Sequence, residues 1–92
     1  MGIEGIRLKI DRIIYQNSVV DLAIPIELYV SKKGKTFQVT SEELLMWGQG
    51  YSLDEALDEF YSLAIDNIGF AERFGRGFNQ YSDALMRHVE GS

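Results

Sequence analysis

Residues 22–40 read LAIPIELYVSKKGKTFQVT, and this stretch decides the fold. Apolar side chains alternate with other residues along its first half, which is the period of a strand with one buried face. The loop KKGK follows at 32–35, where Gly34 can take the positive φ of a tight turn. Phe37 and Val39 then alternate along the returning strand. We therefore predict a β-hairpin whose long strand has these residues on its inner face: Leu22, Ile24, Ile26, Leu28 and Val30.

A further alternating segment precedes the hairpin at residues 6–10. Its alternation loses phase over residues 12–15, which predicts a bulge or bend, and residues 16–18 have the composition of a turn. Pro25 has no N–H to donate to a ladder. We therefore expect Pro25 where the long strand lacks a neighbour on its N–H side.

A helix start follows at Ser52. In this capping box the Ser52 side chain accepts from the Glu55 N–H, and Glu55 reaches back to the Ser52 N–H. Gly69 is the expected C-cap, with an end near Arg73 as the alternative. The inward stripe of the helix has 3.6-residue spacing and consists of Leu53, Ala56, Leu57, Phe60, Leu63, Ala64 and Ile68.

The remaining segments are shorter. Residues 44–47 are expected to form a brief third strand that runs into a glycine turn at 48–50. A glycine-punctuated loop is expected over 70–78, followed by a helix over about 79–89 that buries Tyr81, Ala84 and Leu85. The predicted fold is α+β: a small antiparallel sheet of three to four strands, in β-β-β-α order, packed by one main amphipathic helix and followed by a short C-terminal helix. We expect one domain over 1–92, with its core at about 6–69 and an extension at 70–92.

Composition excludes several classes of protein. The 92 residues are 46% hydrophobic, as in globular domains, and contain no cysteine, so disulfides and thiolate sites are impossible. No apolar run approaches the roughly 18 residues of a membrane span, and the first residues do not resemble a secretory signal. We expect a cytoplasmic protein with no membrane partner. A domain this small buries only about 60–65% of its unfolded surface, so we also expect a homo-oligomer.

The charge is unevenly distributed. The chain has a net charge of −5, but residues 36–70 carry seven acids and no Lys or Arg. Such a block repels phosphate backbones and favours a basic protein partner over nucleic acid. The alternative is an acidic helix face that is merely solvated.

No catalytic, cofactor or metal site is expected, so we predict that the chain is not an enzyme. His88 is the only histidine, and it lies near a helix end, where a cation is favourable in any case. The acids of the helix start point outward from one regular element and cannot surround an ion. A glycine turn at 48–50 before a helix N-terminus can bind an anion, but the acidic first turn and the lack of a following Lys favour a structural turn.

Partner-binding residues are expected around the helix start. Trp47 and Tyr51 are aromatic residues beside a charged rim, which is typical of interfaces, although a core role is the alternative for each. The predicted partner site consists of Trp47, Tyr51, Asp54, Glu55, Asp58 and Glu59. A second hypothesis is a structural or regulatory homo-oligomer. A third is weak nucleic-acid binding through Arg73, Arg76 and the lysines of the 32–35 loop.

The hairpin followed by Gly48-Gln49-Gly50-Tyr51-Ser52-Leu53-Asp54-Glu55-Ala56-Leu57 resembles the glycine, Ser/Thr, Glu-Ala-Leu stretch of HicB-like antitoxins. The resemblance covers about residues 24–68. It implies a partial RNase H-like β-β-β-α core without catalytic carboxylates. It also implies a protein that neutralises a small, basic RNA-cleaving toxin by packing against it, usually as a dimer or higher oligomer.

Overall fold

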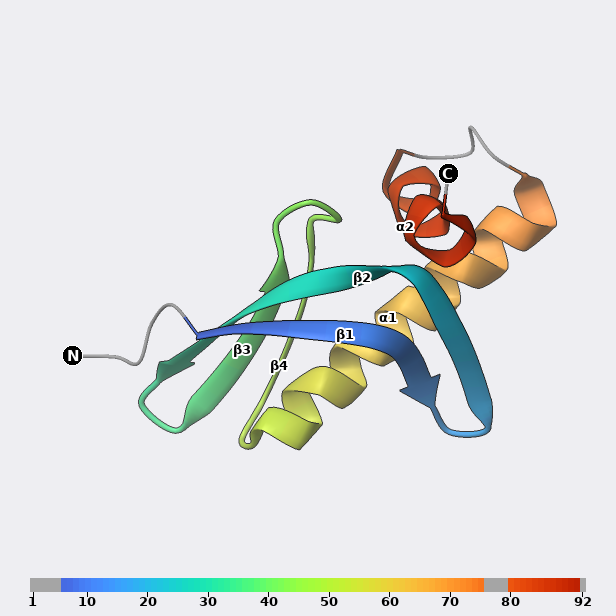
Figure 1. Ribbon diagram of the computed structural model, residues 1–92. Coiled ribbons are helices and arrows are strands. Elements are labelled where there is room, and N and C mark those ends of the chain that lie inside the picture. Colours follow the sequence, from blue (N-terminus) through green and yellow to red (C-terminus); the bar gives the residue numbers. More distant parts are fainter. Residues whose placement is uncertain (1–5, 76–79, 92) are drawn as a thin grey trace.

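The computed structural model describes residues 6–75 and 80–91. Four strands form one antiparallel sheet in the order β1-β2-β3-β4, and two helices follow (Figure 1). The predicted α+β class is confirmed, with four strands and a β-β-β-β-α-α order. The elements are β1 (Ile6–Tyr15), β2 (Ser18–Lys33), β3 (Thr36–Ser41), β4 (Met46–Gly50), α1 (Leu53–Phe74) and α2 (Gln80–Glu90).

The β1–β2 ladder is irregular between Ile10 and Arg12, just before the predicted 12–15, which pair regularly. Ile10 pairs with Ile26 and Arg12 pairs with Asp21, so residue 11 alone lies opposite residues 22–25. Pro25 falls in this unpaired stretch of β2, where its missing N–H costs no ladder bond, as expected. The extra residues also break the alternation. Ile24 is 43% exposed, and its predicted place on the inner face is therefore wrong.

The glycine segment belongs to a strand and not to the predicted turn. Gly48 pairs with Val39 inside β4, and Gly50 pairs with Phe37. A Cβ built on Gly48 would lie 2.3 Å from the Ala56 carbonyl oxygen and 2.6 Å from the Phe60 nitrogen. Both atoms are backbone, so any side chain here would push α1 away from β4. Close packing of helix on strand, and not a turn, requires this glycine.

Helix α1 is longer than its predicted end at Gly69. Gly69 lies inside the helix, and burial continues past it at Ala71. The helix ends at Phe74, one residue beyond the predicted alternative end. Gly75 follows with φ 80°, and its N–H donates to the Ala71 carbonyl over 2.9 Å. The first part of the predicted 70–78 loop is therefore helical, and residues 76–79 lie outside the described ones.

Helix α2 covers the part of β2 that no strand pairs on its second edge. β3 pairs only with the last five residues of β2, from Tyr29 onward. The His88 ring, almost fully buried, lies 3.0 Å through Nδ1 from the Ile24 carbonyl oxygen, beside the bulge. Its Nε2 lies 3.0 Å from Glu43 Oε1, in the turn between β3 and β4. His88 therefore ties α2 to the sheet at two points, which is a structural role.

One face of the sheet and the helices enclose the core (Figure 1). Rows such as Val30–Val39–Gly48 face α1, and rows such as Tyr29–Thr40–Trp47 face the opposite side, where the described residues place no helix. Neither described helix is long and apolar enough to cross a membrane. The buried apolar residues are Ile10, Ile13, Leu22, Ile26, Leu28, Val30, Val39, Leu44, Met46, Ala56, Phe60, Ala64, Ile68, Ala71, Leu85 and Met86.

Candidate functional site at the β4 edge and helix α1

The predicted partner residues lie on β4, just after it, and on the first two turns of α1. Trp47 is 53% exposed on the face of the sheet that α1 does not cover, and Tyr51 is 78% exposed just beyond the strand. Neither aromatic belongs to the core, so the core alternative is wrong for both. The acids Asp54, Glu55, Asp58 and Glu59 are all exposed on α1.

Two of these acids accept hydrogen bonds from the protein's own backbone. Glu55 Oε1 accepts a hydrogen bond from the Tyr51 N–H over 2.8 Å, and Glu59 Oε1 accepts from the Gln49 N–H over 3.2 Å. The predicted capping box is thus half right. Ser52 Oγ accepts from the Glu55 N–H over 3.1 Å, but Glu55 returns to Tyr51 and not to Ser52.

The bonds to Gln49 and Tyr51 also protect an edge. β4 is the last strand of the sheet, and its outward N–H groups form a template for strand pairing unless something covers them. The carboxylate of Glu59 takes the donor of Gln49, and that of Glu55 takes the N–H of Tyr51, immediately after the strand. Both acids therefore serve the fold, whatever they contribute to a partner.

The aspartates of α1 have no such partner. Within residues 6–75 and 80–91, no Lys or Arg forms an ion pair with Asp54, Asp58 or Asp66. All three side chains are exposed. Because no basic residue occurs over 36–70, their field is not compensated locally. This side of α1 can attract a positively charged surface.

An apolar groove lies between the start of β4 and the middle of α1, and Glu59 is the acid among its lining residues. The groove encloses about 400 Å³. Four of its lining side chains are hydrophobic and 40% or more exposed: Leu45, Trp47, Leu63 and Tyr81. The remaining lining residues are Leu44, Met46, Glu59 and Asn67.

Sequence reasoning found only Trp47 and Glu59 among the lining residues of this groove. Leu63 was assigned to the inward stripe of the helix, and Tyr81 was predicted to be buried; the structure exposes 40% of each. Leu63 lies at the margin of the inward stripe of α1, and Asn67, one turn later, lines the groove with it. This marginal position in the helical repeat is the signal in the sequence that marks Leu63 as a groove residue.

Leu45 has an unusual backbone. Its φ is 53°, in the left-handed region that a leucine side chain disfavours, and 60% of the residue is exposed. Apart from Leu45, Gln16 in the β1–β2 turn is the only non-glycine residue in the described ranges with a positive φ. A strained, exposed leucine does little for the core, so its presence points to a role outside it.

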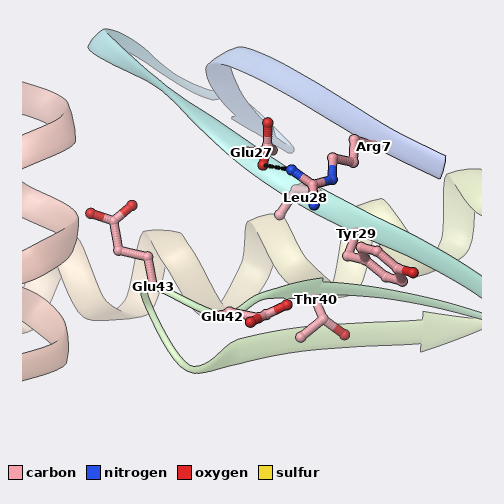
Figure 2. Close-up of a pocket in the computed structure, with 7 residues that line it drawn as sticks. All are labelled: Arg7, Glu27, Leu28, Tyr29, Thr40, Glu42 and Glu43. Atoms are coloured by element: carbon pink, nitrogen blue, oxygen red, sulfur yellow. Dashed lines mark hydrogen bonds and ion pairs between the residues drawn. The ribbon is translucent and has the colours of Figure 1, made fainter. Parts of the chain in front are cut away.

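A second depression lies on the open face of the sheet and is mainly polar. Figure 2 shows Arg7 and Glu27 joined by an ion pair of 3.2 Å, with Tyr29 and Thr40 beside them. Glu42 and Glu43 point in different directions, and Glu43 is the acid that contacts His88 (Figure 2). The described part of the chain holds no group of three His, Asp or Glu side chains able to bind a metal ion.

The fold shifts the pKa of the Tyr61 side chain. Burial raises the pKa of the Tyr61 hydroxyl, and the nearby Asp11 carboxylate raises it further. Tyr61 packs against the core and makes an edge contact with Phe60, so the shift belongs to a neutral, structural phenol.

The basic residues of the nucleic-acid hypothesis are not gathered into one surface. The turn with Lys33 and Lys35 lies at one end of the molecule, whereas Arg73 is in the last turn of α1, at the other end (Figure 1). Lys32 Nζ lies over the Phe37 ring, 5.1 Å from its centroid. Arg76 lies outside the described residues.

Comparisons with protein-family models, with curated proteins and with solved structures give no match.

Proposed function

We propose that this chain is a non-catalytic protein-interaction module that binds a basic protein partner through the exposed side of α1. The observation that carries the proposal is the set of three exposed aspartates, Asp54, Asp58 and Asp66, that no described cation pairs. An acidic surface steers a basic partner toward it and raises the rate of association. Exposed Trp47 supplies the kind of aromatic contact on which interface affinity depends.

The resemblance to HicB-like antitoxins gives this proposal its most specific form. It makes the partner a small, basic RNA-cleaving protein that is inhibited when its surface is covered. The order β2, β3, β4, α1 agrees with the β-β-β-α core that the resemblance implies for residues 24–68. In this form the chain needs no catalytic group of its own.

The test is titration calorimetry with the product of the neighbouring reading frame, which the proposal expects to be a small basic protein. Asp54→Asn, Asp58→Asn and Asp66→Asn combined should weaken binding by about tenfold or more, since each removed charge costs affinity at a desolvated contact. A matched control loses three exposed acids outside α1: Asp21→Asn, Glu27→Gln and Glu42→Gln. The control should bind within about threefold of the unaltered chain.

Two results would contradict the proposal. If the neighbouring product is not basic or does not bind, the antitoxin-like form fails. If both triple variants lose affinity equally, net charge and not the α1 surface controls binding. Binding should also weaken as salt rises, because exposed charges are screened over about 8 Å at physiological ionic strength.

A homo-oligomer is the second candidate, and the exposed apolar groove is the observation that favours it. Exposed apolar patches of this kind mark association surfaces. Sedimentation velocity at micromolar concentration distinguishes the two: a dimer that dissociates in the Leu63→Ser variant supports self-association through the groove. A monomer that binds a basic protein supports the leading proposal.

A further inference from the structure

The groove between β4 and α1 has a shape and a border that favour one kind of occupant. Its hydrophobic walls come from three parts of the fold: the β3–β4 turn with β4, the middle of α1, and the start of α2. Leu45 and Trp47 are the most exposed of its lining residues. At one rim, Glu59 adds a carboxylate to an otherwise apolar lining.

The backbone of β4 offers a hydrogen-bond donor at the same place. The N–H of Gln49 points away from β3, because it donates to Glu59, and residues two apart on a strand point their N–H groups to the same side. The N–H of Trp47 therefore also points outward, beside the groove. No acceptor for it is found among residues 6–75 and 80–91. Farther along, Glu55 and Glu59 occupy the edge, so only a short extended segment has room to pair.

The backbone at Leu45 is an independent sign of a ligand. With φ at 53° and 60% of the residue exposed, Leu45 adds strain to the turn and little burial to the core. A contact with a bound apolar side chain would give this leucine the packing that the isolated chain lacks.

Charge decides between a second copy and a different protein. In a two-fold contact across the groove, both copies would bring the same acidic border into one interface, since such interfaces pair the same patch with itself, and the Glu59 carboxylates would share it. Asp66, three residues after Leu63 on α1, would add to this repulsion. A segment with Lys or Arg beside its apolar residues meets the same surface with attraction.

We propose that the groove lined by Leu45, Trp47, Leu63 and Tyr81 receives an apolar side chain from a short, extended segment of a basic partner, which pairs with β4 at Trp47. This inference rests on the proposed function and specifies its anchor site. Lysine or arginine residues next to the anchor lie against Glu59 and the acidic side of α1. The anchor contributes the contact area, and the charges determine which partners bind.

The experiment is an NMR titration of the full chain with three blocked peptides of about ten residues. The first has a central Leu-Trp pair flanked by lysines, the second has the same centre flanked by glutamates, and the third has a Ser-Ser centre flanked by lysines. We expect the first to bind at least about fivefold tighter than either of the others. Its shift changes should be largest at Leu45, Trp47, Leu63 and Tyr81.

Leu45→Asn removes the apolar wall, and asparagine tolerates a positive φ; it should weaken the first peptide by about fivefold or more. Gln16→Asn is the matched control, because it relieves the same backbone conformation far along the chain from the groove, and it should leave binding unchanged. A Leu45→Asn variant that binds as well as the unaltered chain overturns the anchor site.

The pattern of peptide binding distinguishes failure of this inference from failure of the proposed function. If the first and third peptides bind equally, the acidic surface acts without the groove, and only the inference fails. If the first and second bind equally, the groove takes apolar segments of any charge, and the basic partner fails with the inference. If none binds, the anchor site is overturned, and calorimetry with the whole basic protein decides the proposed function. If the chain dimerises through the groove without peptide, both are overturned.

Discussion

Replacing Leu45 by asparagine should leave the fold as stable as before, or slightly more stable. A left-handed conformation costs an L-residue about 1–2 kcal/mol. Most of this cost is absent for asparagine, because its short polar side chain can hydrogen-bond locally in that conformation. Fully burying a leucine side chain contributes about 1.5–3 kcal/mol. Because Leu45 is 60% exposed, only about 0.6–1.2 kcal/mol of that is at stake. The two terms nearly cancel, and the expected net gain is about 0.5 kcal/mol.

Urea unfolding measures this difference. At a slope of about 1 kcal/mol per molar, typical of a small domain, the midpoint should rise by about 0.5 M, and the melting temperature by about 2–4 °C. Gln16→Asn relieves the same backbone strain at a turn residue that contributes no apolar burial, so it should stabilise by about 1 kcal/mol. The difference between the two variants then measures the packing of Leu45 alone.

A loss of more than about 1 kcal/mol in Leu45→Asn would refute this reasoning. Such a loss would mean that the Leu45 side chain holds the turn between β3 and β4 in place, and that its exposure understates its contacts. The strain would then have a structural cause, and the groove would lose one of its supports as a docking site.

Gly48→Ala should destabilise the fold by about 2–3 kcal/mol in thermal melts, because the new Cβ meets the backbone of α1. Gly69→Ala has open space around it and should stabilise the fold by about 0.5–1 kcal/mol. Equal effects of the two variants would contradict the close approach of α1 to Gly48. Ser52→Ala should cost about 1 kcal/mol in urea unfolding by removing the N-cap, and no change would mean that the cap is dispensable. The raised pKa of Tyr61 means that the unfolded chain loses its phenolic proton first, so stability should fall as pH rises above about 10. Tyr61→Phe should reduce this fall, and Asp11→Asn should reduce it less; an unchanged pH profile would contradict the shift.

Local patterns predicted the elements whose signal is local. The hairpin around Gly34 and the cap at Ser52 each depend on neighbouring residues, and the structure has both. The irregularity of β1 falls between Ile10 and Arg12, ahead of the predicted 12–15. The errors concern contacts between distant segments. In the sequence Gly48 stands between a short apolar run and a helix start, so the local composition predicts a turn. Only the approach of the Phe60 backbone shows why a strand needs this glycine.

The candidate site was predictable only in part for the same reason. Acid content identified the charged side of α1, and the aromatic residue Trp47 was expected at an interface. The marginal phase of Leu63 on α1 is visible in the sequence, but its place beside Tyr81 and β4 depends on how the two helices pack, which no local period reports. The φ of Leu45 has no signature in its neighbours: a leucine after a leucine predicts burial, and the tight turn between β3 and β4 overrides it.

Glu55 and Glu59 accept hydrogen bonds from the backbone and the aspartates do not, and this difference decides how the partner surface has to be tested. Reversing the charge of all the acids of the first two turns would also place a cation against the N–H groups that Glu55 and Glu59 now satisfy. Loss of binding in that variant would then report a loosened β4 edge as readily as a lost partner contact, since exposed strand edges self-associate. Asp54, Asp58 and Asp66 accept none of these bonds, so their neutralisation leaves the edge covered. If binding depends on the aspartates alone, the partner therefore contacts the exposed surface of α1, and the loss of affinity in the variant does not come from a destabilised β4 edge.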